Sequence, residues 1–177
     1  MRNGRMWGLL SAAALAAALA GGCGYRVAGR TNALPAGIQS IAVPAFENRT
    51  TRYRIEQRLT EATVHEFLAR AGYRIVSNAA NADAVVRGKV LSLEVSPLLY
   101  DTATGRATTM LVTMHCEVFL EETATKRVLY HNADFLFRNE YEISTDVKSF
   151  FEEQDPAVER MARDFAARLV AAITESY

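Results

Sequence analysis

Two long segments of the chain alternate apolar and polar residues, which is the pattern of β-strands with one buried face. In residues 107–121 the even positions from 110 to 120 are all apolar, and in residues 129–141 the apolar positions are mostly odd. Polar turns at residues 101–105 and 122–126 precede these two segments. Because short turns join antiparallel neighbours, the pattern predicts an antiparallel meander that also includes the strand before the first turn.

That preceding strand, residues 83–100, changes phase along its length. Ala84, Val86 and Val90 lie at even positions, whereas Leu91, Leu93 and Val95 lie at odd positions. Since side chains alternate strictly between the faces of a regular strand, one residue of irregularity is needed here. The sequence therefore predicts a β-bulge near Val90 and Leu91, or a break at Gly88.

Two segments show helical spacing. Residues 52–71 carry a broad apolar arc and end at Gly72, as a helix with a glycine cap does. A second helix is predicted to start at Asp155 as the N-cap, with Pro156 as its first helical residue. Its apolar positions follow helical spacing closely: Val158, Met161, Ala162, Phe165, Leu169, Ala172 and Ile173.

Two short strands complete the predicted elements. Residues 38–46 contain Pro44, which predicts either an edge strand or the end of a strand, and residues 73–76 form the other. A polar turn is expected at residues 47–51. The order of elements predicts an α+β fold, in which a small mixed sheet of about four to five strands carries two helices on one face. We expect a single domain over residues 38–177.

The first 22 residues differ from the rest of the chain. Arg2 and Arg5 are their only charges, and an apolar stretch follows that is short for a membrane-spanning helix. Small residues then precede Cys23. This arrangement predicts a secretory signal peptide over residues 1–22.

The small residues and the cysteine that follows them together resemble a bacterial lipobox. The resemblance implies that Cys23 becomes the first mature residue, with an N-acyl chain and an S-linked diacylglycerol, and that residues 23–37 form a lipidated tether. The sequence departs from the usual pattern at Ala20, where leucine is common, and an ordinary signal peptide with a free Cys23 thiol is the alternative. Gly24 stands where an aspartate would retain some lipoproteins at the inner membrane, so the outer membrane is favoured.

Composition and charge narrow the classes of function. The 177 residues include 20 basic and 20 acidic ones, and half are apolar, so the chain can bury a core and is not disordered by composition. A nucleic-acid partner is not expected, because such proteins carry a basic excess. Removing residues 1–22 removes two arginines and no acidic residue, which leaves the mature chain mildly acidic.

No pattern of residues points to catalysis. There is no glycine-rich phosphate loop, and His65, His115 and His131 lack metal-ligand spacing, so neither an enzyme nor a metal or other cofactor is expected beyond the lipid on Cys23. We expect cross-strand polar pairing of His115 and His131. Cys116 lies on the apolar face of its strand, which predicts a buried thiol that packs as a small hydrophobe.

The chain carries several short motifs that are informative together: residues 23–29 (CGYRVAG), 34–35 (LP), 38–48 (IQSIAVPAFEN), 59–62 (LTEA), 71–76 (AGYRIV) and 82–84 (ADA). In combination they are similar to those of the LptE family of lipopolysaccharide-assembly lipoproteins. The resemblance implies an outer-membrane lipoprotein, anchored on the periplasmic side, in which a sheet and two packed helices form a plug inside the LptD β-barrel. It also implies support for barrel assembly, binding of lipopolysaccharide and its delivery to the outer leaflet.

The resemblance supports the expected lipopolysaccharide-binding residues less well than it supports the expected barrel partner. The positions of the family's basic residues hold Tyr100-Asp101-Thr102 and Phe151-Glu152-Glu153 here. Basic residues on the strands and near these positions remain candidates for pairing with lipid phosphates. The alternative is cross-strand pairing with Glu94, Glu117 and Asp134. The candidates are Arg87, Lys89, Arg106 and Lys148.

A second resemblance competes with the first. Residues 41–50, followed by a helix and residues 72–76, are also similar to the N-terminal domain of TolB and to lipoproteins of the CsgG and LpoB types, which are periplasmic binding, regulatory or secretion modules. The length of the meander and the start at residues 23–25 favour LptE. An LptE-like protein predicts a stoichiometric barrel partner, whereas an LpoB-like module predicts a peptidoglycan synthase.

Overall fold

The computed structural model describes residues 34–35, 37–71, 73–142 and 147–176, with the backbone alone for 71 and 147–155. These residues belong to one compact unit, which begins at Asn32. The elements are β1 (Ser40–Ala42), β2 (Glu47–Asn48), α2 (Ile55–Ala71), β3 (Arg74–Ile75), a 3-10 helix (Ala79–Asn81), β4 (Ala84–Tyr100), β5 (Ala107–Glu122), β6 (Val128–Glu142) and α3 (Val147–Glu175). The signal peptide and most of the tether lie outside the described residues.

The described strands form one mixed sheet of six, with the order β3-β1-β4-β5-β6 and with β2 alongside β4. Strand β1 runs parallel to β3 and β4, and β2 runs parallel to β4. Strands β4, β5 and β6 form the predicted antiparallel meander. The two-residue strand β2 accounts for a sheet slightly larger than the four to five strands expected.

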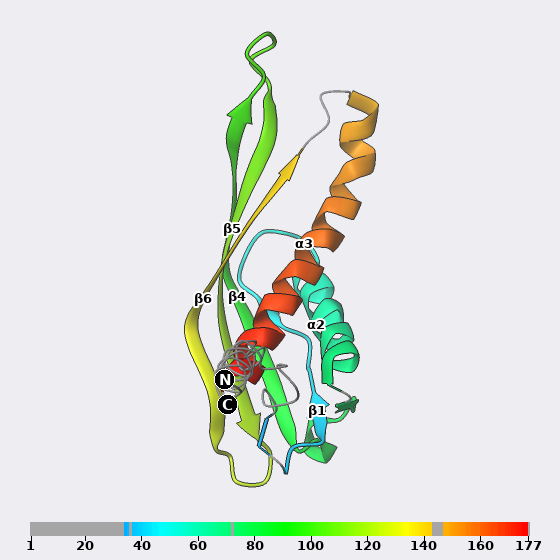
Figure 1. Ribbon diagram of the computed structural model, residues 1–177, viewed down its shortest axis with the longest axis vertical. Coiled ribbons are helices and arrows are strands. Elements are labelled where there is room, and N and C mark those ends of the chain that lie inside the picture. The colour runs from blue at the N-terminus through cyan, green and yellow to red at the C-terminus, as the bar shows by residue number, and fades with distance from the viewer. Residues whose placement is uncertain (1–33, 36, 72, 143–146, 177) are drawn as a thin grey trace, which may run out of the picture. The chain divides into compact units, whose positions relative to one another are not determined.

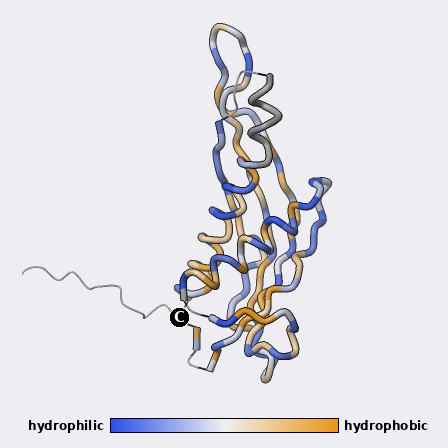
Figure 2. The backbone as a smooth tube through the Cα atoms, turned by 90° about the vertical axis from the view of Figure 1, so that its right-hand side faces the viewer, coloured by the Kyte–Doolittle hydropathy of each residue, from blue (hydrophilic) through white to orange (hydrophobic). Residues whose placement is uncertain are grey.

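Both described helices pack on one face of the sheet, which confirms the predicted α+β layering (Figure 1). The even positions of β5 from Val112 to Leu120 are buried, and the odd positions between them are half-buried. The tube in Figure 2 accordingly changes repeatedly between hydrophobic and hydrophilic colours. The apolar face predicted for the last helix is buried or half-buried. The largest fully buried side chains include Phe67, Phe137, Phe165, Ile41, Leu59, Met114 and Leu169.

The phase change in β4 arises from a bulge, as one of the two alternatives predicted. Val90 pairs with Cys116 and Ser92 pairs with His115, so Leu91 is the extra residue. Gly88 has a different role. A Cβ atom at this position would lie 2.7 Å from ring atoms of Phe46, so glycine leaves room for that buried ring.

Strand β1 decides between the two alternatives predicted from Pro44. It ends at Ala42 and lies between β3 and β4, so Pro44 follows the end of an interior strand, as the second alternative predicted. The segment expected to be only a turn is a correction, because it contains β2, which pairs with Lys89 and Val90. This difference arises because pairing with β4 is a contact between residues distant in sequence, which a local pattern does not report.

The helix starts also differ from those predicted. Helix α2 begins at Ile55, three residues late, because Arg54 has φ +59° and cannot continue a right-handed helix. Helix α3 begins at Val147, so Pro156 lies inside it and is not its first residue. Proline removes one helical hydrogen bond, and Pro156 itself is exposed.

Strand β6 contains a second irregularity. Cys116 pairs with Phe135 and Val118 pairs with Asn132, so the partner strand has one extra residue between them. Ala133 is consequently exposed, although its odd position predicted a place on the apolar face. Phe135 and Phe137 are buried as predicted.

The carboxylate of Asp83 joins β1 to the start of β4. Its Oδ2 accepts hydrogen bonds from the Gln39 N–H (3.1 Å), the Ser40 N–H (2.8 Å) and the Ser40 hydroxyl (2.7 Å). The Ser40 hydroxyl bond, followed by the backbone bonds, lowers the pKa of Asp83 below its usual 3.8. A carboxylate with a lowered pKa stabilises the folded state above the unfolded-state pKa and loses that effect as the pH falls through the folded-state pKa.

We therefore expect Asp83→Asn to lower the free energy of unfolding at pH 7 and to make little difference at strongly acidic pH. Urea unfolding of both proteins at pH 7 and at steps below pH 3.8 measures the change. Asp164→Asn, on the exposed side of α3, is the control and should have a small effect. A stability difference that stays constant down to the lowest pH would contradict this role for the carboxylate.

Cys116 is buried on β5, as predicted, with 1% of its surface exposed. Burial, and secondarily the negative charge of Asp134, raises the pKa of the thiol to about 12. We expect Cys116→Ser to cost about 1–3 kcal/mol, because a hydroxyl would be buried in an apolar site. The native thiol should also resist a disulfide reagent at pH 8 and react after unfolding in urea. Rapid native labelling, or an unchanged melting curve for the serine variant, would place Cys116 outside the core.

Candidate functional site

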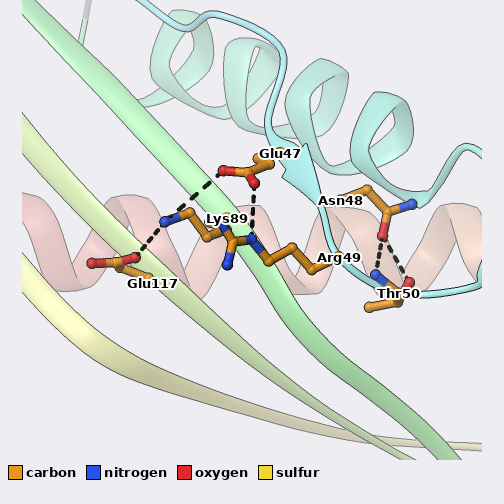
Figure 3. A network of polar contacts seen from close by, with 6 residues as sticks. All are labelled: Glu47, Asn48, Arg49, Thr50, Lys89 and Glu117. Carbon is orange, nitrogen blue, oxygen red and sulfur yellow. Dashed lines mark hydrogen bonds and ion pairs between the residues drawn. The ribbon is translucent and has the colours of Figure 1, made fainter.

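The face of the meander opposite the helices, here called the open face, carries a row of charged residues across four strands. Lys89 Nζ lies 2.9 Å from Glu117 Oε2 and 3.9 Å from Glu47 Oε2 (Figure 3). His131 Nε2 lies 3.6 Å from the other oxygen of Glu117. The row arises from the register, because Lys89 is paired with Glu47 on β2 and with Glu117 on β5. The hydrogen bond from Lys89 lowers the pKa of Glu117, and its positive charge adds to that effect.

A second cluster lies beside this row on the open face. The Arg87 guanidinium is 3.9 Å from Glu121 and sits over the Phe119 ring, 5.9 Å from its centroid. Lys126 is 3.5 Å from the same Glu121 carboxylate. The Phe119 ring also meets the His131 ring edge to face, at 6.4 Å. The two clusters therefore form one continuous network of charged and aromatic side chains.

The histidines form the cross-strand polar pairs that their positions predicted. His115 Nδ1 lies 2.6 Å from Asp134 Oδ1, and His131 contacts Glu117. Of the residues that the structure describes, no group of three or more histidine, cysteine, aspartate or glutamate side chains could hold a metal ion. The arrangement is a surface of paired charges.

The structure brings together only some of the predicted lipopolysaccharide-binding residues. Arg87 and Lys89 share the open face, and each already has a carboxylate within 4 Å. Arg106 follows the β4–β5 turn at the other end of the meander, about 36 Å from Lys89 at the usual rise of a strand. Lys148 lies in the part of α3 for which only the backbone is described. A phosphate group would have to compete with Glu117 and Glu121 for the paired cations.

The end of the β4–β5 hairpin carries an apolar surface that sequence reasoning missed. Four large apolar side chains near the turn are each 42–58% exposed. A cluster of exposed apolar side chains of this kind is unusual on a protein surface. The signal in the sequence is the run from 97 to 100, where proline and three apolar residues interrupt the alternation. The exposed residues are Val95, Leu98, Leu99 and Tyr100.

Comparison with solved structures shows a fold shared by bacterial lipoproteins. Rare lipoprotein B from Shewanella oneidensis is similar, with a TM-score of 0.50 and 17% identity, over 77% of this chain and 94% of that chain. A lipoprotein B from Nitrosomonas europaea gives a TM-score of 0.51 and 12% identity, over 85% of this chain and 90% of that one. A hypothetical protein from Chlamydia trachomatis gives 0.51 and 10% identity, over 78% of this chain and 99% of that one. A search of curated proteins finds no match.

The described residues form a small α+β domain with an ion-paired open face, and they share this fold with the lipoproteins named above. None of the helices in the described part of the chain is long and apolar enough to cross a bilayer. The family model described as LptE, lipopolysaccharide-assembly, matches residues 38–173. The chain therefore belongs to the LptE family of lipopolysaccharide-assembly lipoproteins, which are not enzymes.

Proposed function

We propose that this chain is an outer-membrane lipoprotein that sits inside the LptD β-barrel, supports the assembly of that barrel and aids insertion of lipopolysaccharide into the outer leaflet. The observation that carries the proposal is the extent of the family match. The match runs from residue 38, before β1, to residue 173, and so includes the whole sheet, α2 and all but the last two residues of α3.

The surface of the domain supports a plug inside a barrel. The interior of a large outer-membrane barrel is polar, and the open face presents charged side chains that already neutralise one another. Such a face can lie against a polar wall without leaving an unpaired charge. The surface formed by Val95, Leu98, Leu99 and Tyr100 is apolar, unlike the open face, and could make a second, hydrophobic contact with the barrel.

The proposed anchor is the lipid on Cys23, after removal of the signal peptide over residues 1–22. Leu34, within the expected tether, is buried in the core, and its N–H donates a hydrogen bond of 3.0 Å to the Tyr73 hydroxyl. The domain thus includes Leu34, and the proposed link to the membrane consists of residues 23–33. Three acyl chains would make that attachment effectively permanent, since a single chain gives only marginal binding.

Affinity purification of the tagged, acylated chain from its own outer membrane in mild detergent tests the proposed partner. We expect one large β-barrel to co-purify in a stoichiometric amount, identified by mass spectrometry. Recovery of a peptidoglycan synthase or a secretion pore in its place would overturn the proposal and favour the LpoB-like or CsgG-like alternative.

The proposed lipopolysaccharide contacts need a separate test. We propose that phosphates engage Arg87 and Lys89 on the open face, with Arg106 and Lys148 as further candidates. Binding of purified lipopolysaccharide should weaken in Arg87→Ala/Lys89→Ala, whereas Arg160→Ala/Arg163→Ala, at two exposed positions of α3, provides a control with the same change in charge. Equal binding by wild type and both double variants would remove the open-face cations from the site.

A further inference from the structure

The loop between β2 and α2 exposes an aromatic side chain flanked by two arginines. Tyr53 is 79% exposed, and Arg52 and Arg54 are exposed on either side of it. The Arg54 guanidinium lies over the Tyr53 ring, 5.0 Å from its centroid. We call Arg52, Tyr53 and Arg54 the 52–54 surface. Figure 1 shows the loop that carries it at the upper end of α2.

The two arginines of this surface lack the ion pairs that other basic residues have. Within the described ranges, neither Arg52 nor Arg54 has a carboxylate within ion-pair distance, whereas cations on the open face do. The paired cations include Arg87, Lys89, Lys126 and Arg127. The intramolecular contacts of the domain therefore leave two positive charges available at this place.

The local structure around the surface is also unfavourable for these residues. Arg54 has φ +59°, a left-handed conformation that a side chain with a Cβ atom adopts at a cost. Two cations just before α2 meet the positive end of its dipole. Exposed charged residues that break several local rules and have no ion pair are expected where a protein binds something else.

The loop is held in one conformation. The Asn48 amide donates to the Arg52 carbonyl and to Glu56, both at 2.9 Å. The side-chain oxygen Oδ1 of Asn48 accepts hydrogen bonds from the N–H and the hydroxyl of Thr50, both at 2.8 Å (Figure 3). A surface fixed in advance loses less conformational entropy on binding than a mobile one does.

We propose that the 52–54 surface docks onto an acidic surface of a partner protein. Arginine and tyrosine are the residue types that dominate the energetics of protein interfaces, and a guanidinium pairs with a carboxylate through two parallel hydrogen bonds. A lipid surface fits less well, because its negative charge is spread evenly and would repel the nearby Glu47 and Glu56. A folded partner can place its carboxylates opposite Arg52 and Arg54 alone.

Photocrosslinking in living cells tests this surface in the full chain. A photoreactive amino acid at the exposed Thr51 keeps all three residues of the surface intact. We expect an adduct with one protein, joined through a peptide rich in aspartate and glutamate. The double variant Arg52→Glu/Arg54→Glu should lower the adduct yield by about tenfold or more, since like charges then face each other. Arg160→Glu, an exposed change on α3, should leave the yield unchanged.

Two further variants separate docking from folding. Arg54→Gly removes the left-handed strain, so it should not lower the melting temperature and should still weaken the adduct. Replacing the mapped carboxylates of the partner with arginine should restore the adduct in the double charge-reversal variant. Absence of an adduct, an adduct with lipid only, a mapped peptide without acidic residues, or a yield that ignores charge reversal would each overturn the proposal. The crosslinking result does not depend on the partner being a β-barrel. The docking proposal can therefore fail while the proposed function stands.

Discussion

Replacement of Phe165 by alanine is expected to lower the free energy of unfolding by about 3–5 kcal/mol. Phe165 is fully buried on α3, where its ring meets the rings of Phe135 and Phe137 edge to face at 5.7 Å. It also meets Phe46, at 6.5 Å. One side chain thus joins the closing helix to β6 and to the segment before β2. Urea unfolding followed by circular dichroism measures the loss.

Two variants set the scale of this effect. Arg163→Ala changes an exposed side chain on the same helix and should alter stability by less than about 1 kcal/mol. Phe165→Leu keeps an apolar side chain in the aromatic cluster and should cost less than alanine does. A loss below about 1 kcal/mol for Phe165→Ala would mean that the cluster collapses around the missing ring, or that the helix packs elsewhere.

Replacement of Cys23 by alanine is expected to move the protein from the membrane fraction to the soluble fraction while the domain stays folded. The reason is that the proposed acyl chains supply the attachment, and no helix in the described part of the chain can cross a bilayer. Fractionation without detergent, followed by immunoblotting, measures the distribution. Circular dichroism of the released protein checks the fold.

The second cysteine of the chain is the matched control for this experiment. Cys116→Ala removes a thiol from the core and should leave the membrane-bound fraction unchanged, because that thiol is buried in β5. If Cys23→Ala protein sediments with membranes in the absence of detergent, the lipid on Cys23 is not the main anchor. Salt extraction of those membranes would then distinguish electrostatic adsorption from insertion.

The elements with strong local patterns were predicted correctly. The turns at residues 101–105 and 122–126 are present, with φ +67° at Gly105 and φ +59° at Lys126. The buried even face of β5 and the bulge at Leu91 also match. Each of these features depends on alternation within a strand or on the residues of a turn. Both can be read from residues that are neighbours in the sequence.

The differences involve contacts between distant residues. No local signal shows that β1 lies between β3 and β4, or that residues 47–48 pair with β4. The helix starts differ for another reason. An arginine at a left-handed position and a proline inside α3 both break preferences on which sequence reasoning depends.

The candidate site was predictable in part. Alternation alone placed Arg87 and Lys89 on one face, and Glu117 proved to be the partner of Lys89. Glu121, the partner of Arg87, was not anticipated, because the diagonal geometry of the twisted sheet decides it. The pattern of apolar residues predicts neither the exposure of Tyr53 nor the left-handed conformation of Arg54.

Helix α3 supplies Phe165, Leu169 and Ile173 to the core, although the meander ends at Glu142. A growing chain therefore displays the apolar face of the sheet while about 30 further residues are added, which takes roughly 2–6 s at usual rates of synthesis. The core therefore cannot close until the residues of α3 have been made. That delay gives chaperones time to hold the nascent chain.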